Sequence, residues 1–350
     1  MDGGLLRNNG GTVMQGKTLV TGAAGFIGFH TTKRLLERGE EVIGIDNLND
    51  YYEVQLKRDR LEVLQQNPRF TFHCVSVEDG ENVSKVLAEG GFDNVIHLAG
   101  QAGVRAPPSD ADLYVASNLV GFCNVMEGCR ANNVKHLVYA SSSSVYGSEA
   151  VPPFSANHCV DHPQSLYAAT KRANELLAHS YSYNYELPTT GLRFFTVYGP
   201  WGRPDMAVYK FTKKISEGEP INLYGNGELL RDFTYVDDVV DIILRVVDSP
   251  PTNEYNGAIS PATSQAPYQI YNVGNSQPVA VKELVRLIEV AMGRKAQVHY
   301  EPTPLADMEI THADVQELED AFGFRPTTNL REGIDRFIEW FHDYHSRAIE

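Results

Sequence analysis

KTLVTGAAGFIG, residues 17–28, is the stretch that decides the fold. Lys17–Thr21 has the β-branched and apolar composition of a short strand, and the apolar spacing from Phe26 to Arg38 predicts a helix that ends at Gly39. The glycines between them, in a GxxGxxG spacing, let a phosphate group approach the backbone, because no Cβ atom blocks it and the helix start offers unpaired N–H groups. This spacing is not the commoner GxGxxG, so the motif gains its weight from the strand before it and the helix after it.

The next strand ends in a carboxylate that fits a role in choosing the cofactor. Glu41–Asp46 reads as this strand, and Asp46 lies 24 residues after Gly22. A carboxylate at this place accepts hydrogen bonds from the ribose hydroxyls of adenosine and repels a 2′-phosphate. Asp46 would also fit a plain turn before Asn47, but the strand, glycine turn and helix favour the cofactor role. We therefore predict that NAD binds here in preference to NADP.

The first half of the chain continues to alternate strands and helices. Further strands are expected at Phe70–Val75, Asn94–Leu98, His136–Ser141 and Thr189–Phe195, with helical patterns near 81–88 and 112–132. This alternation is typical of an α/β fold with a doubly wound parallel sheet (Rossmann). Beyond these strands glycine and proline become denser, and regular elements are expected to be more scattered. There we expect a surface loop at Ser249–Pro267, which is rich in proline, and a final helix near Leu330–His345.

Composition and charge limit the classes of function. The chain has 350 residues, of which 42% are hydrophobic and 21% charged, and its formal net charge is −15. That charge argues against sequence-independent nucleic-acid binding, so we expect no nucleic-acid partner. No apolar run reaches the roughly 18–20 residues of a membrane span, and residues 1–17 lack the plan of a secretory signal. We therefore expect a cytoplasmic protein with no membrane partner and a disordered lead-in at 1–16.

The cysteines predict neither a disulfide framework nor a metal site. They are Cys74, Cys123, Cys129 and Cys159, and they form no CxxC pair and have no His-rich segment as partner. We expect buried free thiols in a reducing compartment, and no metal.

A tyrosine and a lysine four residues apart are the candidates for the chemistry. Tyr167 and Lys171 lie near the start of a helical run, Leu166–Tyr181, and residues at this spacing share a helix face. A free tyrosine titrates near ~10, whereas a general base works best with a pKa nearer ~7. Lys171 and the positive nicotinamide ring of an oxidised cofactor are the cations that would favour the phenolate. YxxxK alone commonly marks solvated helix surface, so a second feature is needed.

That second feature is a serine run at the end of the central strand. Ser141-Ser142-Ser143-Ser144 precedes Val145-Tyr146-Gly147 at the carboxyl edge, where doubly wound sheets bind their ligands. A polar turn would explain one or two serines better than four. Ser142, four residues before Tyr146, is the best candidate to hydrogen-bond the reacting hydroxyl of a substrate.

The glycine turn, serine run and YxxxK occur in this order, and with them the chain resembles the extended short-chain dehydrogenase/reductase family over residues 17–345. More narrowly, DNLNDYY at 46–52, QAGVR at 101–105 and RFFTVYGPWGRPDMA at 193–207 resemble the UDP-glucuronate 4-epimerases. The string RDFTYVDD at 231–238 resembles the nucleotide-binding segment of the family. The resemblance implies a domain at 17–195 that mainly binds NAD. It also implies a smaller C-terminal α/β domain at 196–350 that mainly binds a nucleotide sugar, with some elements returning to the sheet.

The resemblance also implies the residues of the site. The catalytic residues would be Ser142, Tyr167 and Lys171. Cofactor contacts would come from Gly22, Ala24, Gly25, Phe26, Ile27, Gly28, Asp46, Asn47, Asn49, Ser76, Val77, Leu98, Ala99, Gln101, Tyr167 and Lys171. Substrate contacts would come from Arg105, Ser142, Ser143, Ser144, Thr196, Arg203, Tyr224, Arg231 and Asp307. In this assignment Arg231 meets the pyrophosphate, Tyr224 stacks on uracil, and Asp307 reaches the ribose or diphosphate. Arg203 would cover the sugar.

Two places depart from the family pattern. An aspartate commonly follows the third strand and holds the adenine, and the matching position here is Ser76. A hydroxyl there weakens the contact without removing NAD. The segment APPS at 106–109 also differs from the usual Tyr- or Ser-containing segment after Arg105, which leaves the local substrate loop open.

The implied reaction is reversible oxidation at the sugar 4-position, with Tyr167 as the base and return of the hydride to the other face. A glucuronate would pass through a β-keto acid that readily loses carbon dioxide. The hydroxyls of the serine run and of Thr196 would hold its carboxylate out of alignment with the ketone. A 4-epimerase of neutral UDP-sugars is the main alternative. Decarboxylases and 4,6-dehydratases carry an acid where this chain has Ser143 and Ser144, and a non-catalytic NAD sensor would need the glycine turn alone.

A homodimer is expected from the same resemblance. Family members usually pair the helices that correspond to Asp112–Asn132 and Leu166–Tyr185 across a two-fold axis into a four-helix bundle. The second stretch carries an apolar stripe made of Leu166, Ala169, Ala173, Leu176, Leu177 and Tyr181. Packing of this stripe on its own sheet is the alternative.

Overall fold

A seven-stranded parallel sheet forms the centre of the molecule. The computed structural model describes residues 16–104, 108–147, 150–253, 259–304 and 307–347. The strands, in sheet order, are β10 (Tyr268–Val273), β6 (Thr189–Phe194), β5 (His136–Ser142), β4 (Asn94–His97), β1 (Lys17–Thr21), β2 (Glu41–Asp46) and β3 (Phe70–Cys74). The order reverses between β1 and β4, so the crevice at their carboxyl ends is the ligand position expected for such a sheet. The predicted doubly wound α/β fold is confirmed.

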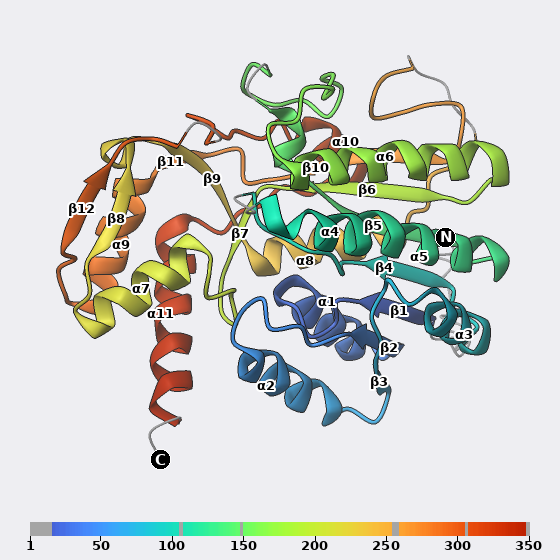
Figure 1. Ribbon diagram of the computed structural model, residues 1–350, viewed down its shortest axis with the longest axis horizontal. Coiled ribbons are helices and arrows are strands. Elements are labelled where there is room, and N and C mark those ends of the chain that lie inside the picture. Colours follow the sequence, from blue (N-terminus) through green and yellow to red (C-terminus); the bar gives the residue numbers. More distant parts are fainter. Residues whose placement is uncertain (1–15, 105–107, 148–149, 254–258, 305–306, 348–350) are drawn as a thin grey trace, which may run out of the picture.

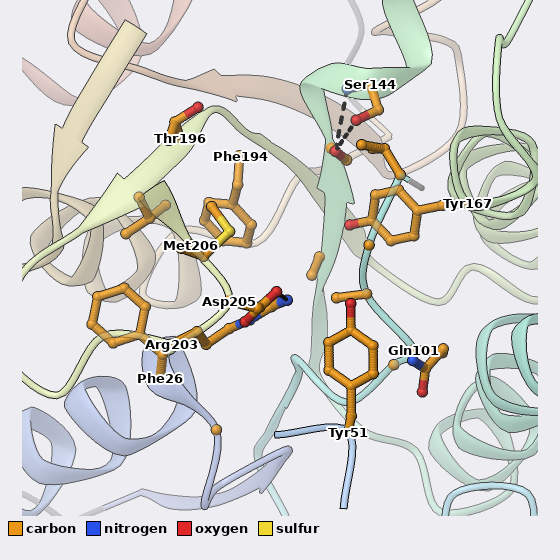
Figure 2. A pocket seen from close by; sticks show the side chains of 18 of the residues that line it. Phe26, Tyr51, Gln101, Ser144, Tyr167, Phe194, Thr196, Arg203, Asp205 and Met206 are labelled. Carbon is orange, nitrogen blue, oxygen red and sulfur yellow. Dashed lines mark hydrogen bonds and ion pairs between the residues drawn. The ribbon is translucent and has the colours of Figure 1, made fainter. Parts of the chain in front are cut away.

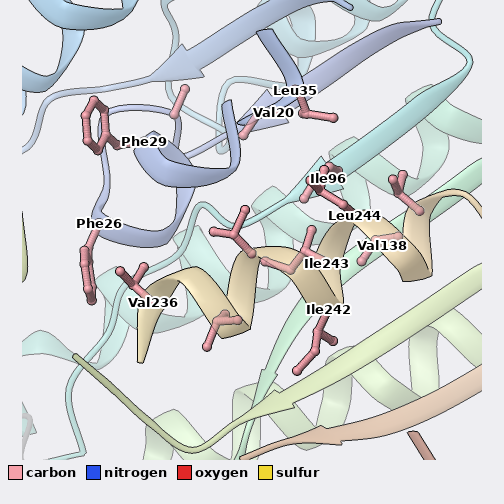
Figure 3. Close-up of a cluster of buried hydrophobic side chains, with 14 of the residues drawn as sticks. Val20, Phe26, Phe29, Leu35, Ile96, Val138, Val236, Ile242, Ile243 and Leu244 are labelled. Carbon is pink, nitrogen blue, oxygen red and sulfur yellow. The ribbon is translucent and has the colours of Figure 1, made fainter. Parts of the chain in front are cut away.

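Helices cover both faces of this sheet (Figure 1). One face packs on α1 (Phe26–Glu37), α2 (Val54–Gln65) and α8 (Val236–Val247). The other face packs on α3 (Gly80–Gly90), α5 (Gly121–Ala131) and α6 (Leu166–Tyr185). Figure 3 shows the first of these cores, in which α8 lays Ile243 and its neighbours against strand residues such as Ile96 and Val138. Burial of the strands on both faces explains why they read as nearly continuous apolar runs.

The second lobe lies beside the sheet and is built on small sheets of its own (Figure 1). One has three strands, β11 (Pro278–Ala280), β9 (Leu230–Tyr235) and β7 (Thr196–Tyr198), and the other pairs β12 (Val298–Glu301) with β8 (Ile221–Tyr224). The helix α10 (Gln316–Phe322) packs on β10 of the large sheet, where Phe322 contacts Tyr271. The helices of the second lobe are α7 (Ala207–Glu217), α9 (Val281–Met292) and α11 (Leu330–Arg347). Aromatic side chains such as Tyr209, Phe337 and Phe341 fill the core between them.

Several details differ from what the sequence predicted. The second half is more regular than expected, and α2 was not predicted. The helical stretch at 112–132 is in fact α4 (Ala111–Tyr114), one π-helical turn (Val115–Val120) and α5. Cys74 and Cys159 are exposed, although all four thiols are free; the exposed pair contradicts the expectation of buried cysteines. The described residues of 249–267 form no helix and none of the named strands, as predicted for a loop, although Ala262 and Ala266 are buried. The lead-in predicted at 1–16 lies outside the described residues except for Gly16. No helix in the described part of the chain is long and apolar enough to cross a membrane.

Candidate active site

A cavity of about 810 Å³ opens at the carboxyl ends of the central strands, between the sheet and the second lobe. Its wall combines the glycine turn after β1, the ends of β2, β4 and β5, the start of α6, and the segments around β7, β8 and β9. Figure 2 shows side chains from both parts of the molecule facing this one space. The cavity therefore joins the segments that the sequence motifs singled out.

The glycine turn presents bare backbone to the cavity. Gly22 has a φ of +71°, and a Cβ atom on it would lie 2.8 Å from the backbone nitrogen of Ala99. The helix α1 begins at Phe26, and its N-cap residue, Gly25, provides no side-chain hydrogen bond. Phe26, Ile27 and Gly28 line the cavity there. The first N–H groups of α1 therefore face the cavity without a side-chain cap, which is the arrangement that binds a phosphate.

Asp46 lies at the end of β2 beside this turn. Its carboxylate accepts hydrogen bonds from the backbone N–H of Ala24 at 3.2 Å and of Leu48 at 2.9 Å. Burial raises the pKa of Asp46, and these two donors together with the charge of Lys57 act in the opposite direction. Asn47 and Asn49 also line the cavity. A carboxylate held in this way suits a ribose diol and opposes an added phosphate.

Two predicted cofactor residues do not line the cavity among the described residues. Ala24 acts through its N–H, which holds Asp46. The Ser76 hydroxyl donates to Glu78 and accepts a hydrogen bond from the Asn47 side chain at 3.1 Å. Its neighbours Val75 and Val77 line the cavity instead, as do the predicted Leu98, Ala99 and Gln101. Ser76 is therefore placed to orient Asn47 rather than to contact a ring in the cavity.

Tyr167 and Lys171 share the cavity-facing side of α6. The helix begins where the Ser165 side chain accepts a hydrogen bond from the N–H of Ala168 at 3.2 Å, which satisfies one of its free donors. Lys171 is 4% exposed, and its Nζ donates to the carbonyl of Ala140 at 3.0 Å. The same Nζ lies 5.9 Å from the centre of the Tyr167 ring. The strand β5 therefore fixes the lysine, and the lysine lies beside the phenol.

Burial shifts the pKa of both groups. It raises the pKa of the Tyr167 phenol, while a hydrogen bond with Ser142 and the charge of Arg203 act to lower it. Burial lowers the pKa of Lys171 to about 8. Ser142 and Arg203 therefore favour the phenolate; the sequence argument had named Lys171 and the nicotinamide ring of the cofactor for this role.

The four serines do not point in one direction. Ser141 donates to the buried carboxylate of Glu175 at 2.6 Å, on the side of α6. Ser142 accepts a hydrogen bond from the N–H of Ser144 and donates to the Ser144 hydroxyl, both at 3.2 Å. Figure 2 shows Ser144 above the Tyr167 ring with these two bonds drawn. Ser142, Ser143 and Ser144 line the cavity and are the hydroxyls available to a substrate.

Asn118 is a site residue that the sequence analysis missed. It is 1% exposed and lies in the π-helical turn. Its side chain accepts from the N–H of Gln101 at 2.8 Å and donates to the Gln101 carbonyl at 3.0 Å and the Thr170 hydroxyl at 3.0 Å. It thereby joins the loop after β4 to α6. A π turn has no signature in apolar spacing, although such turns commonly mark functional sites.

Arg203 enters the cavity from the second lobe. It makes a two-fold ion pair with Asp205, with distances of 3.0 Å and 2.6 Å, and its guanidinium lies 5.6 Å from the centre of the Tyr51 ring. In Figure 2 the Arg203–Asp205 pair and Tyr51 face each other across the space below Tyr167. The sequence analysis quoted Tyr51 and Asp205 only as parts of longer motifs and assigned neither residue a role in the site. Thr196 lines the same wall at the start of β7.

Arg231, Tyr224 and Asp307 lie together on the far wall of the cavity. The Arg231 guanidinium donates to its neighbour's carbonyl, Leu230, at 2.8 Å and lies 4.0 Å from the Asp307 carboxylate. Tyr224 is the last residue of β8. The structure thus brings these three predicted residues together. Arg105, also predicted, lies outside the described residues.

The described residues contain no group of three or more His, Cys, Asp or Glu side chains arranged to hold a metal ion. The chemistry available is that of a buried phenol, a buried amine, hydroxyls and guanidinium groups. These groups suit proton transfer beside a bound cofactor and an anionic substrate.

Residues 18–274 match the NAD dependent epimerase/dehydratase family. The chain is 48% identical over 334 residues to Protein CapI of Staphylococcus aureus, an alignment that covers 95% of this chain and 100% of that protein. It is 43% identical over 334 residues to a probable UDP-glucuronate 4-epimerase of Rhizobium meliloti, with 94% and 98% covered. The crystal structure of UDP-glucuronic acid 4-epimerase from Bacillus cereus with UDP-glucuronic acid and NAD aligns with a TM-score of 0.84 at 30% identity, covering 94% of this chain and 99% of that one. The family match extends over most of the chain and includes both the glycine turn and the YxxxK helix, so this protein belongs to the NAD dependent epimerase/dehydratase family.

Proposed function

We propose that the protein is an isomerase that interconverts UDP-glucuronate and UDP-galacturonate by NAD-dependent 4-epimerisation. One observation carries the proposal: a single cavity joins the glycine turn and Asp46 to Tyr167 and Lys171, and both to Arg203 and Arg231. The glycine turn and Asp46 suit the binding of a dinucleotide. Tyr167 and Lys171 suit a proton transfer, and the two arginines suit the binding of an anionic nucleotide sugar. The relatives and solved structures named above support the same substrate and cofactor.

The residues present fit NAD. The uncapped start of α1 would hold the pyrophosphate, Asp46 the adenosine ribose, and Lys171 the second ribose beside Tyr167. When bound, NAD supplies the acceptor and donor for a hydride. The chain's own task at the sugar is to remove the proton of the 4-hydroxyl at the Tyr167 oxygen and to return it, with Ser142 holding the same hydroxyl.

The proposed substrate also explains the hydroxyls beside the phenol. Ser143, Ser144 and Thr196 line the cavity without adding charge to it. Such neutral donors can hold a sugar carboxylate charged and turned away from the alignment that would release carbon dioxide. Replacing Ser143 and Thr196 with Ala should therefore increase the share of UDP-pentose product, as measured by chromatography. An unchanged product ratio would contradict this role.

We assign the two parts of the molecule different ligands. Residues 17–195 would mainly bind NAD, and residues 196–350 would mainly bind the nucleotide sugar, while β10 returns to the large sheet. A cytoplasmic enzyme is in keeping with cysteines that form no disulfide.

We also propose a homodimer through the two helical stretches that the sequence selected. The side of α6 that is buried within one chain is Ala168, Thr170, Lys171, Asn174, Glu175, Ala178 and Ser182, which is largely polar. Of the apolar stripe, Leu166 is 39% and Leu176 57% exposed, whereas Leu177 and Tyr181 pack against the core of their own chain. Leu113 and Val120, from the adjoining helical stretch, are also exposed. An apolar surface on two neighbouring helices suits a second copy of the same surface.

The test is incubation with UDP-glucuronate, UDP-galacturonate, UDP-glucose and UDP-GlcNAc, each with NAD, followed by separation of the products. Interconversion of the first two, with no net change in NADH absorbance, is the expected result. Turnover of UDP-glucose or UDP-GlcNAc alone would instead identify a 4-epimerase of neutral sugars. A Tyr167→Phe preparation is the control for contaminating activity.

A further inference from the structure

Arg60 is a fully buried cation between the cofactor turn and the loop that carries Arg203. It lies in α2 and is 0% exposed. One of its terminal nitrogens donates to the carbonyl of Ala24 and to the hydroxyl of Tyr52, both at 2.8 Å. The other donates to the carbonyl of Trp201 at 2.6 Å and reaches that of Gly202 at 3.5 Å.

Neutral polar groups, rather than an ion pair, hold this guanidinium. Within the described ranges no carboxylate lies at ion-pair distance from Arg60, and its Nε has no hydrogen-bond partner. A buried charge is costly unless polar groups surround it, and here these groups are backbone carbonyls and one phenol. Two of the carbonyls are 177 residues apart in the sequence, at Ala24 and Trp201. The arginine therefore acts as a cross-link between two distant segments of backbone.

The second of these segments holds an unusual conformation. Trp201 has a φ of +60°, a left-handed value that is unfavourable for a residue with a bulky side chain. Its ring packs against Phe29 of α1 at 5.4 Å and against Trp340 and Tyr344 of α11 at 5.4 Å and 5.3 Å, measured between ring centres. The ring of Trp201 is thus held by α1 and α11, and its carbonyl by Arg60 of α2.

Arg203 follows Trp201 by two residues and lies in the cavity. Arg60 does not line the cavity. Its charge reaches Asp46 at the cofactor end, whereas its effect on the sugar end passes through the backbone that it holds. We propose that Arg60 is a positioning residue: it fixes the segment 201–203 against the glycine turn so that Arg203 meets the sugar of the substrate. This inference rests on the proposed function, which makes Arg203 a contact of the sugar.

The proposal predicts different effects on the sugar and on the UDP portion of the substrate. Tyr224 and Arg231, the candidates for the uracil and the diphosphate, lie on β8 and β9, and Arg60 donates no hydrogen bond to either strand. Loss of Arg60 should therefore weaken the binding of a UDP-sugar and leave the binding of UDP nearly unchanged. A general loosening of the fold would weaken both.

The experiment measures dissociation constants for UDP and for UDP-glucuronate by calorimetry, in a Tyr167→Phe background so that no turnover occurs, with NAD saturating. Arg60→Met removes the cross-link, Arg60→Lys keeps the charge but loses the forked geometry, and Arg58→Met alters an exposed arginine of the same helix as the matched control. We expect both Arg60 variants to weaken UDP-glucuronate about tenfold, the effect of one lost charge-assisted contact. UDP should change by no more than about twofold, as for independent sites.

Equal weakening of UDP and UDP-glucuronate, or no weakening of either, would overturn the proposal. If Arg60→Met does not fold, Arg60→Lys and Tyr52→Phe carry the same comparison, because Tyr52 provides only one of the arginine's partners. Failure of the proposed function gives a different result. In that case the unmodified enzyme does not convert UDP-glucuronate, and the ratio of the two affinities is measured with whichever UDP-sugar it does convert.

Discussion

In the proposed reaction Tyr167 acts as a phenolate and must first lose its proton, but burial raises its pKa. The Ser142 hydroxyl and the Arg203 charge oppose that shift, so the phenol depends on both parts of the molecule. Tyr167→Phe removes only the proton acceptor, and we expect the turnover of UDP-glucuronate to fall by at least about 100-fold. Calorimetry should show that the same ligand still binds. Turnover within a few-fold of the unmodified enzyme would show that another group is the base.

The lowered pKa of Lys171 predicts how the stability of the fold depends on pH. Its pKa in the folded chain is about 8, below the value of 10.5 for an unburied lysine. Below pH 8 both the folded and the unfolded chains hold the proton, so the buried charge destabilises the fold. Between pH 8 and 10.5 the unfolded chain binds more protons, so the stability of the fold rises with pH.

The comparison is with Lys171→Met, which carries no charge at any pH. The stability of this variant relative to the unmodified protein should decrease between pH 7 and pH 10 by about 2–3 kcal/mol. Urea unfolding at the two pH values measures this difference, and terms that do not depend on pH cancel. A difference that stays constant would mean that Lys171 titrates normally.

Asp46 provides a prediction about cofactor choice. Its carboxylate is held by two backbone N–H groups beside the glycine turn. Asp46→Ala removes an acceptor for the ribose hydroxyls and a charge that repels a 2′-phosphate, so the affinity for NAD should fall relative to that for NADP by about tenfold or more. Fluorescence titration with both cofactors checks this. Asp50→Ala, at an exposed position nearby, is the control, and an unchanged preference for NAD in Asp46→Ala would assign discrimination to another residue.

Site residues could be predicted from the sequence where their role depends on neighbours that are close in the sequence. The glycine turn, Asp46 and the Tyr167–Lys171 pair each follow from spacing within one element or from one element to the next. Asn118 and Arg60 were not predictable, since their roles depend on carbonyls and hydroxyls that lie far away in the sequence. Ser76 shows the reverse case: a position matched by sequence forms its bonds to Glu78 and Asn47 and does not line the cavity.

At the scale of elements, α6 reverses the usual amphipathic rule. Its buried side carries Lys171, Asn174 and Glu175, because this side holds the site and the fully buried Glu175–Arg193 pair, with an Nε–Oε1 distance of 2.8 Å. Of its apolar residues, Leu166 and Leu176 face outward, whereas Leu177 and Tyr181 pack on the core of their own chain. The sequence therefore predicted the helix correctly, whereas the direction of its stripe needed the structure. The helix α2 was missed because seven of its residues are charged or polar, and two of those, Lys57 and Arg60, are buried.

The exposed part of the stripe on α6 provides a variant that tests the dimer. Leu177 is half-buried and packs on the core of its own chain, whereas Leu176 is 57% exposed. Leu176→Glu should dissociate a dimer to monomers in light scattering at micromolar concentration, and turnover should fall with it. Glu127→Gln, an exposed polar position on α5, serves as the control for a surface change without apolar loss. An unmodified protein that is monomeric and fully active would contradict the dimer.

At the scale of the whole molecule, the cavity couples the large sheet to the second lobe. NAD would contact mainly the first half of the chain and UDP mainly the second, yet both ligands share one wall. Each ligand at 100 times its dissociation constant should raise the free energy of unfolding by about 2.7 kcal/mol. With both present the increases should at least add, in a single thermal transition. Two separate transitions, each moved by one ligand, would show that the halves unfold independently.

The place of β10 in the large sheet has a consequence for biosynthesis. This strand, Tyr268–Val273, pairs with β6, but the ribosome makes it only after the chain has passed through β7, β8, β9 and α8. Until then the nascent protein displays the free edge of β6, Thr189–Phe194, whose residues are all buried in the finished fold. An unpaired strand edge invites pairing with other chains. Ribosomes that translate this protein should therefore recruit chaperones late in synthesis, when most of the sheet has formed but β10 has not yet paired with β6.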